Sequence, residues 1–424
     1  MKILSLDAVE TLDSRGCPTL TAAVVTDKGR FYASVPSGAS VGAHEAVEKR
    51  DGGKRLSGKG VKTACENVCT MLAKAIAGRE FNDLKELDDI IISCDKYPDK
   101  RTVGANAALG VSMAAARAFA LEKDMPLYRY FGDMALLPCP MMNILNGGVH
   151  ADNNLDIQEF MIMPVGAANF RECMDMGMEV YAALKSLLKQ KGLSTAVGDE
   201  GGFAPDLEND GQALEFICDA VVKAGLRPKK DICLAIDAAA SGWFNGEEYV
   251  LSKSGRHFLR QDLISYYKKL CADFPVISIE DGIHEDDFEG FALLKKSVDV
   301  QVVGDDLFVT DTERIKKGID ADSASAVLIK PNQTGTVTQA AMAVNTAAKA
   351  GMAAVISHRS GDTEDSFIAD MCVGLGTGQI KTGAPARAER TAKYSRLLII
   401  EHELGKNAVF AGKNSINNVK WLDS

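Results

Sequence analysis

Ionisable residues follow eight short apolar runs in the second part of the chain. They are Glu159, Glu200, Asp237, Glu280, Asp305, Lys330, His358 and Lys381. Carboxylates, amines and an imidazole gathered in one place could hold a metal ion, move protons and bind an anion. A single charged residue at the end of a strand is usually just solvated, but this repeated pattern predicts one shared active site.

Three of the acids end successive runs, namely Asp237, Glu280 and Asp305. Carboxylates brought together repel one another, and their pKa values rise unless a cation neutralises them. An all-oxygen ligand set selects a hard ion, and few protein ligands favour Mg²⁺ over Ca²⁺. We therefore predict a magnesium site. The adjacent Asp281 and Asp306 are interpreted as capping or surface residues, because neighbouring side chains of a strand point to opposite faces.

Lys330 and Lys381 end the sixth and eighth runs. A metal dication and a second ammonium group would both lower the pKa of a lysine, which could then act as a general base. Removing a proton next to a carboxylate produces an enediolate, whose charge Mg²⁺ and Lys381 could stabilise. Glu159 and Glu200 remain to protonate a leaving hydroxyl group, because hydroxide is a poor leaving group.

Three polar segments could bind the rest of an anionic substrate. The run of His358, Arg359 and Ser360 combines an imidazole, a guanidinium fork and a hydroxyl group suited to phosphate. The segment SGASVGAHEA (37–46) resembles an anion-binding or lid loop, and NGGVHADNN (146–154) contains a histidine that could reach the site. Either loop alone is weak evidence, because clusters of Ser and Gly are usually turns.

Short strands alternating with helices must position these side chains. The eight runs are DIQEFMIMP, STAVGDEGG, ICLAIDAAA, PVISIEDGI, QVVGDDLFV, SAVLIKPNQ, AAVISHRS and GQIKTGAP. Eight strands are the number that a closed (β/α)8 barrel requires, and functional groups in such barrels lie at the C-terminal ends of the strands. We predict an α/β fold in which residues 131–424 form this barrel and carry the active site.

The first part of the chain has a different pattern. The extended segments KILSLDAVETL, PTLTAAVVT and RFYASV, with a turn at Asp27 to Gly29, predict a β-meander. Apolar residues at spacings of three and four then predict helices between about residues 60 and 130. Residues 1–130 should therefore form a smaller α+β domain, and LLPCPMMNILNGG is interpreted as the passage into the barrel domain.

The composition argues against several classes of protein. The 48 Lys and Arg residues against 58 Asp and Glu residues give a net charge of −10, which disfavours nucleic acid or an anionic membrane as a partner. No run approaches the roughly 20 apolar residues that span a bilayer, and the N-terminus turns acidic too soon for a signal peptide. We expect a cytoplasmic protein whose ten cysteines, which lack CxxC spacing, are reduced.

Several sequence blocks carry a family resemblance, and they occur in the order that the family shows. They are LDSRGCPT, VPSGASVGAHEA, MNILNGGVHADNNLDIQEFMIMPVGA, AVGDEGGFAP, IED, VGDDLFVT, LIKPNQTGT, VISHRSGDTED and GQIKTGAPARAER. In these blocks the chain resembles the enolase family over essentially its whole length. The resemblance implies a barrel whose first strands run ββαα, a homodimer or larger homo-oligomer, and Mg²⁺-dependent interconversion of 2-phosphoglycerate and phosphoenolpyruvate. A Lys base working with Mg²⁺ is an established pattern of this superfamily.

The resemblance also implies roles for single residues. Asp237, Glu280 and Asp305 look like the ligands of a first magnesium ion. Ser40, in the SGASVG loop, looks like the ligand of a second ion that arrives with the substrate, a small phosphorylated carboxylate. Lys330 resembles the base that removes the C2 proton.

The remaining roles concern the leaving group and the two ends of the substrate. Glu200 resembles the acid that helps to expel the C3 hydroxyl group, and Glu159 supports it. Lys381 is similar to the lysine that holds the substrate carboxylate. The other groups around the phosphate and carboxylate ends are His150, Gln158, His358, Arg359 and Ser360.

The chain departs from the usual family pattern at a few positions. Cys17 stands where Asn is usual, Val41 where Thr is usual, and residues 238–242 differ from the common form. The Val41 change removes a hydroxyl group beside Ser40 and so bears on lid closure, second-metal affinity or substrate choice. Two alternatives stay open: a relative acting on a phosphonate analogue of the phosphonopyruvate or carboxyphosphonoenolpyruvate type, and a non-catalytic binding protein on the same scaffold.

Overall fold

An antiparallel sheet begins the structure, a computed structural model that describes residues 1–38, 42–416 and 419. The sheet contains β1 (Ser5–Leu12), β2 (Pro18–Thr26) and β3 (Gly29–Ser34) in the order β1-β2-β3. Gly29, with φ of +139°, allows the tight turn between β2 and β3. The register, with Val24 opposite both Leu6 and Phe31, is that of a β-meander, as predicted.

Helices cover one face of this sheet. They are α1 (Lys62–Asn67), α2 (Ala73–Ile76), α3 (Leu84–Ser93), α4 (Ala105–Glu122) and α5 (Leu127–Phe131). Most of α4 is buried because its many alanines allow close approach on several sides. At Gly110 an added Cβ would lie 2.9 Å from Ala22 of β2, so the helix packs directly on the sheet.

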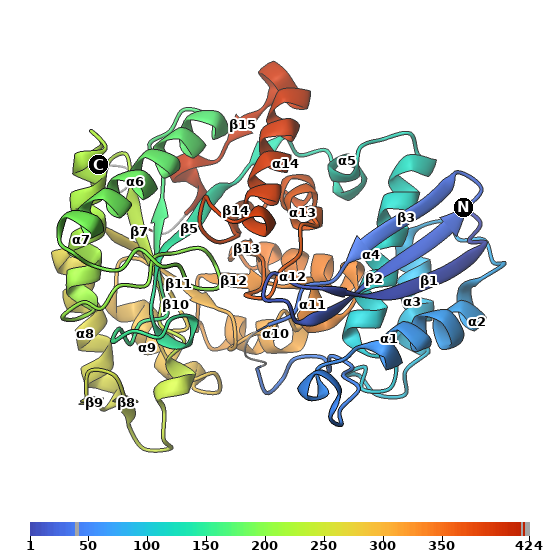
Figure 1. The fold of residues 1–424 in the computed structure, drawn as a ribbon, viewed down its shortest axis with the longest axis horizontal. Helices are drawn as coiled ribbons and strands as arrows, with labels where there is room; N and C mark the ends of the chain where they lie inside the picture. The colour runs from blue at the N-terminus through green and yellow to red at the C-terminus, as the bar shows by residue number, and fades with distance from the viewer. Residues whose placement is uncertain (39–41, 417–418, 420–424) are drawn as a thin grey trace.

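Eight strands form a closed barrel beside this region (Figure 1). They are β5 (Cys139–Asn146), β6 (Glu159–Met163), β7 (Cys233–Asp237), β10 (Val276–Glu280), β11 (Gln301–Gly304), β12 (Ala326–Ile329), β13 (Ala353–Ser357) and β14 (Gly378–Lys381). Nearly every residue of these strands is buried, which explains their continuous apolar character. The predicted α/β barrel is confirmed.

One strand of the barrel runs against the others. β6 pairs antiparallel with both β5 and β7, whereas the remaining neighbours are parallel. Two helices, α6 (Phe170–Gln190) and α7 (Asp210–Lys223), then precede β7, so the order is ββαα. Glu159 therefore begins its strand, yet it lies opposite Asp237, the last residue of β7, at the same rim.

The sequence assignment of two strands was wrong. The run STAVGDEGG (194–202) is not a barrel strand; it makes only isolated bridges, such as Val197 with Phe203. Its place is taken by β5, within the segment that we interpreted as a passage between domains. Prolines 138 and 140 gave that segment the look of a linker, but in the barrel Pro140 lies opposite Ile380 of β14. Glu200 consequently sits in a loop.

Further helices surround the barrel. They are α8 (Arg260–Asp273), α9 (Phe288–Ser297), α10 (Thr312–Asp320), α11 (Pro331–Thr334), α12 (Val337–Lys349), α13 (Phe367–Leu375) and α14 (Ala388–Leu404). Several begin at a side chain that accepts a backbone N–H of the first turn, as Asn209, Asp311 and Thr336 do for α7, α10 and α12. Two short strand pairs complete the fold. β8 (Tyr249–Leu251) and β9 (Arg256–Phe258) are antiparallel, whereas β4 (Leu136–Leu137) and β15 (Val409–Phe410) are parallel.

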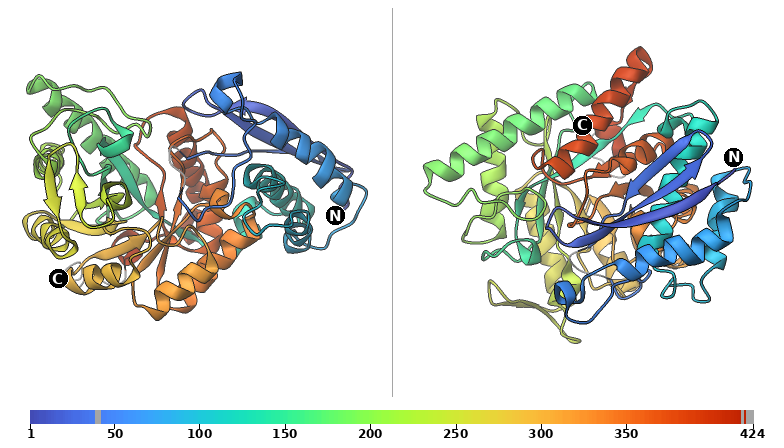
Figure 2. Two further views of the ribbon diagram at one scale, coloured as in Figure 1. Left: turned by 90° about the horizontal axis from the view of Figure 1, so that it is seen from below. Right: turned by 45° about the vertical axis from the view of Figure 1, so that its right-hand side comes forward.

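The N-terminal elements lie on one side of the barrel, against α12 and α13 (Figure 1, Figure 2). A backbone pair between Ser37 and Gly361, with N···O distances of 2.7 and 2.9 Å, joins the segment after β3 to the loop after β13. This pairing brings the start of the 37–46 segment to the barrel. Among the described residues, no helix combines the length and apolar character that crossing a bilayer requires.

Candidate active site

A cavity of about 540 Å³, including its open entrance, lies at the rim formed by the C-terminal ends of the parallel strands. Of the predicted site residues, those that line it are His150, Gln158, Glu159, Glu200, Asp237, Asp305, Lys330, His358, Arg359, Ser360 and Lys381. Glu280 lies beneath them and is fully buried. Ser40 lies outside the described residues.

Lys381 is the central cation of the cavity. Its Nζ lies 3.0 Å from Asp237 Oδ2, 2.8 Å from Glu280 Oε1 and 3.1 Å from Glu159 Oε2. Burial opposes its charge, but the carboxylates of Asp237, Glu159 and Glu280 outweigh burial and raise the pKa of Lys381 well above its usual value. The side chain is therefore an ammonium group at neutral pH.

Lys330 lies across the cavity and contacts the Asp305 carboxylate. Burial lowers the pKa of Lys330, and Arg359 lowers it further, but the Asp305 charge outweighs both and raises it. Gln333 donates a hydrogen bond of 3.0 Å to the other oxygen of Asp305. Each lysine pKa is raised because each ammonium group pairs with carboxylates, and the lowering that we expect from a metal dication stays a prediction.

The three predicted metal ligands are buried at strand ends. Burial and the neighbouring Asp237 raise the pKa of Glu280 well above its usual value. At Asp305 burial acts in the same direction, but the Lys330 ammonium prevails and the pKa is lowered. In this structure Lys381 contacts Asp237 and Glu280, and Lys330 contacts Asp305. A buried, all-carboxylate donor set of this kind fits a hard divalent cation such as Mg²⁺.

The neighbouring acids do not behave as we predicted. Asp281 and Asp306 line the same cavity, and with Asp305 they place carboxylate oxygens within 4.8 Å of one another. β10 ends at Glu280 and β11 at Gly304, so strand alternation no longer decides where these side chains point. Asp281 does cap locally, accepting the N–H groups of Asp305 and Asp306. Burial, followed by the Asp305 charge, raises the pKa of Asp306 to about 7.

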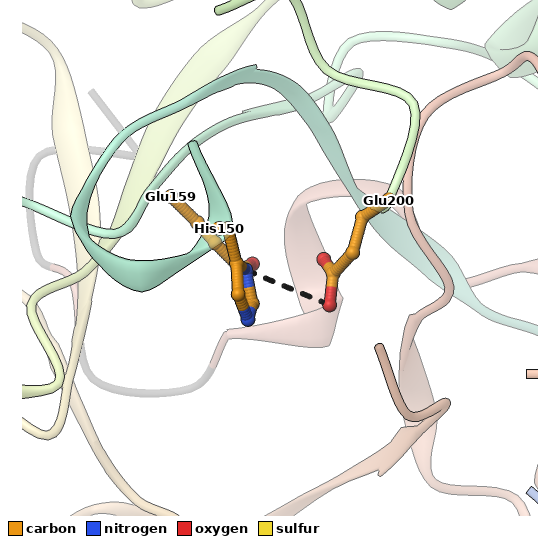
Figure 3. Close-up of side chains that lie close together, drawn as sticks. All are labelled: His150, Glu159 and Glu200. Carbon is orange, nitrogen blue, oxygen red and sulfur yellow. Dashed lines mark ion pairs between the residues drawn. The ribbon is translucent and has the colours of Figure 1, made fainter. Parts of the chain in front are cut away.

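On the opposite side, His150 and two glutamates face one another (Figure 3). His150 Nδ1 lies 3.5 Å from Glu159 Oε1 and 3.8 Å from Glu200 Oε1. Burial and the charge of Glu200 raise the pKa of Glu159 well above normal. The pKa of Glu200 is lowered, because His358 and His150 outweigh burial. The two glutamates therefore have pKa values shifted in opposite directions, with His150 beside both.

The N-terminal segment contributes a buried ion pair to the cavity. Glu45 accepts hydrogen bonds of 2.9 and 3.2 Å from the Arg359 guanidinium, and both side chains are only 5% exposed. Arg359 also donates to Asn332 at 3.1 Å. The predicted link between residues 37–46 and the barrel is therefore present for the described part of that segment.

Comparison with known proteins agrees with this architecture. The sequence family described as "Enolase, N-terminal domain" matches residues 3–131, and "Enolase, C-terminal TIM barrel domain" matches residues 134–419. The chain belongs to the enolase family. A curated relative named enolase, from Acidothermus cellulolyticus (strain ATCC 43068 / DSM 8971 / 11B), is 52% identical over 415 residues, which are 97% of this chain and 96% of the relative.

One departure from the usual enolase pattern now has an explanation. The backbone N–H of Cys17 donates to Asp13 Oδ1 at 2.9 Å, a bond that any non-proline residue at this position can make. The turn after β1 therefore does not require the usual Asn. Val41 lies outside the described residues.

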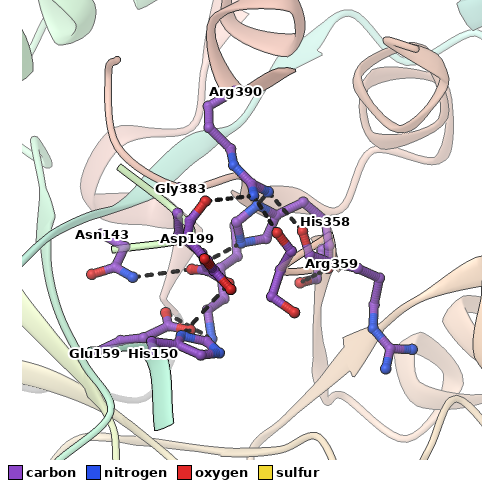
Figure 4. A network of polar contacts seen from close by, with 12 residues as sticks. Asn143, His150, Glu159, Asp199, His358, Arg359, Gly383 and Arg390 are labelled. Atoms are coloured by element: carbon purple, nitrogen blue, oxygen red, sulfur yellow. Dashed lines mark hydrogen bonds and ion pairs between the residues drawn. The ribbon is translucent and has the colours of Figure 1, made fainter. Parts of the chain in front are cut away.

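Asn143 is a residue of this enolase-family site that the sequence reasoning missed. It is fully buried on β5, and its Nδ2 donates to Glu200 Oε2 at 3.0 Å (Figure 4). Had residues 139–146 been recognised as a strand, alternation with Cys139 and Met141, which belong to the barrel interior, would have pointed Asn143 inward. Asn143 was missed because residues 139–146 were interpreted as a passage between domains and not as a strand.

Proposed function

We propose that the protein is a magnesium-dependent hydro-lyase that interconverts 2-phosphoglycerate and phosphoenolpyruvate. The observation that carries the proposal is the complete set of acids and lysines in one buried cavity of a chain that is 52% identical to a protein named enolase. A non-catalytic scaffold would have no reason to retain several buried charges at high desolvation cost.

We assign the proton transfer at C2 to Lys330, whose Nζ reaches the cavity from the end of β12. Lys381, an ammonium group between three carboxylates, would hold the substrate carboxylate, where negative charge builds up in an enediolate. Mg²⁺, held by Asp237, Glu280 and Asp305, supplies further positive charge at that place when bound. Pairing with carboxylates raises the pKa of both lysines.

The departing C3 hydroxyl group needs a proton, and the glutamate pair can provide it. The geometry supports a shared role: Glu200 is the acid that we place at the leaving group, and Glu159, on the other side of His150, supports it. Lys330 follows β12 and Glu200 lies in the loop before α7, so the base and the acid come from different elements and the two half-steps can be tested independently.

The remaining assignments concern the substrate's charged ends and the assembly. Arg359, Ser360, His358 and Gln158 would surround the phosphate and carboxylate, and Ser40 would bring a second Mg²⁺ with the substrate. We further propose a homodimer or larger homo-oligomer in the cytoplasm, with no nucleic acid as a partner, and a division between an N-terminal domain of residues 1–130 and a barrel domain of residues 131–424.

The test is the formation of phosphoenolpyruvate from 2-phosphoglycerate, followed by its enol absorbance with Mg²⁺ and after chelation. We expect turnover that chelation abolishes and added Mg²⁺ restores. A zero rate on 2-phosphoglycerate together with turnover of phosphonopyruvate would instead assign the protein to the phosphonate-processing alternative. No turnover of either compound by folded, Mg²⁺-loaded protein would favour the binding-protein alternative.

A further inference from the structure

Arg390, on α14, is fully buried and donates to two loops at the cavity (Figure 4). Its Nη1 lies 2.6 Å from His358 Nδ1 and donates to the carbonyl of Arg359 at 2.6 Å. Its Nη2 donates to the carbonyls of Ser360 at 2.6 Å and Asp199 at 3.1 Å. One side chain thus joins the loop before Glu200 to the loop that carries His358, Arg359 and Ser360.

The space for this guanidinium is closely fitted. Gly383 has φ of +80°, and a Cβ there would lie 2.7 Å from Arg390 Cδ and 2.8 Å from the carbonyl oxygen of Glu200. The Glu389 carboxylate lies 3.3 Å from Arg390 Nε and partly neutralises the charge of the guanidinium. The carbonyl partners leave the guanidinium little freedom to turn away from His358.

The contact with His358 determines where that imidazole carries its proton. A guanidinium has only N–H donors and does not lose its charge in proteins, so it cannot accept a hydrogen bond. His358 Nδ1 must therefore be the acceptor. The neutral ring then carries its single proton on Nε2, which lies 3.3 Å from Glu200 Oε2. Burial, the largest influence, also lowers the pKa of His358 to about 4, so the ring is neutral at pH 7.

We propose that Arg390 is a positioning residue that holds His358 as the Nε2–H tautomer and directs this N–H toward Glu200. The Asn143 amide donates to Oε2 of Glu200 at 3.0 Å, and the His358 N–H points toward the same oxygen. The other oxygen, Oε1, then faces His150 and Glu159. The role in turnover rests on the function proposed above for Glu200. The tautomer itself is a property of the resting protein.

The first experiment is ¹⁵N NMR of the full chain, labelled at its six histidines and free of substrate. The His358 signals are identified by their absence in His358→Gln. We expect a pyridine-like Nδ1 and a pyrrole-like Nε2 in the parent protein. A pyrrole-like Nδ1, or a doubly protonated ring at neutral pH, would overturn the proposal without any variant of Arg390.

The second experiment compares Arg390→Lys and Arg390→Gln with Arg396→Gln. Arg396 is also on α14, but it pairs with Asp370 and Glu403 away from the cavity. We expect Arg390→Gln to lose the single tautomer and to lower kcat by about 100-fold, the size of effect that misplacing a catalytic group produces. Arg390→Lys, whose ammonium group can also only donate, should retain more of the tautomer and of kcat than Arg390→Gln. The Arg396 control should keep the parent His358 signals and the parent kcat.

Folded Arg390→Gln protein with an unchanged His358 spectrum would overturn the positioning role. If neither variant folds, the spectrum of the parent protein still decides the tautomer. Should the parent show the Nε2–H tautomer but fail to convert 2-phosphoglycerate, the proposed function fails while the positioning of His358 by Arg390 stands. The two failures are therefore distinguishable.

Discussion

The interior of the barrel and its mouth are built from the same strands, but they treat buried polar groups differently. In the interior, Gln301 and Gln379 exchange two amide hydrogen bonds of 3.0 and 2.9 Å, and Gln301 also donates to Ser278. These groups are neutral, and they form hydrogen bonds with other residues of the protein. At the mouth, Lys381 is surrounded by carboxylates, and burial keeps the pKa of Glu280 well above normal.

This difference separates groups that serve stability from groups that await a ligand. Neutral, mutually bonded amides fill an apolar interior at little cost. Buried charges are expensive even when paired, and strongly shifted pKa values gather at functional sites. If this comparison is right, changes at the mouth should alter activity far more than changes in the interior, and the reverse should hold for folding stability.

The largest effect is expected for Lys330→Ala. Without the amine, exchange of the substrate's C2 proton with solvent should stop and turnover should fall by roughly 10⁴-fold, at the upper end for loss of general acid–base catalysis. The measurement is exchange of the C2 proton in deuterium oxide, followed by NMR. Exchange at the parent rate would rule out the role assigned to Lys330.

A smaller loss is expected for Glu200→Gln, which keeps the Asn143 contact through the amide oxygen but cannot supply a proton. Dehydration should fall by about 100-fold, the lower end for general acid–base catalysis, while C2 proton exchange continues. Single-turnover dehydration and exchange are measured on the same sample. Loss of both reactions in equal proportion would contradict the separation of acid and base.

In the interior, Gln301→Ala leaves Gln379 Oε1 without its donor, whereas Gln379 Nε2 keeps its hydrogen bond to the Ser415 carbonyl. We expect the free energy of unfolding to fall by about 1–3 kcal/mol, the cost of an unsatisfied buried polar group, with kcat/KM unchanged. The double substitution Gln301→Leu with Gln379→Leu also takes the Gln379 donor from the Ser415 carbonyl, so it should be at least as destabilising as the single one. Denaturant unfolding of the parent protein and of both variants would test this order.

The smallest effect is expected for Asp88→Asn, which tests whether a buried carboxyl group with a shifted pKa always marks function. Asp88, on α3, accepts two hydrogen bonds from Thr338 of α12, at 3.1 Å from N and 2.7 Å from Oγ1. Burial raises its pKa from 3.8 to about 6. Between these values the unfolded chain loses the proton while the folded protein keeps it, so Asp88 weakens stability as pH rises.

Asp88→Asn should therefore flatten the dependence of unfolding free energy on pH between 3.8 and about 6 and leave kcat unchanged. Chemical denaturation across this pH range, with the parent protein as control, measures the slope. A fall in kcat would show that this buried group, far in sequence from the barrel rim, belongs with the mouth.

Much of the fold followed from local patterns in the sequence. Strands β7, β10, β12 and β13 are largely apolar runs, and side chains such as Asp311 and Thr336 mark helix starts as their types predict. The first barrel strand was missed because Pro140 obscures an otherwise buried run, and only closure of the barrel against β14 assigns it. The opposite direction of β6 came from the family resemblance, not from periodicity.

The sequence alone determined which chemical groups the site contains, because acids, lysines and a histidine recur at the ends of apolar runs. Only the tertiary structure decided which of them meet. Lys381 contacts acids from three other strands, and Arg390 reaches both His358 and the carbonyl of Asp199. The pKa of each site residue depends on charges and donors a few ångströms away, and these belong to residues far apart in the chain. Their distances cannot be read from spacing along the sequence.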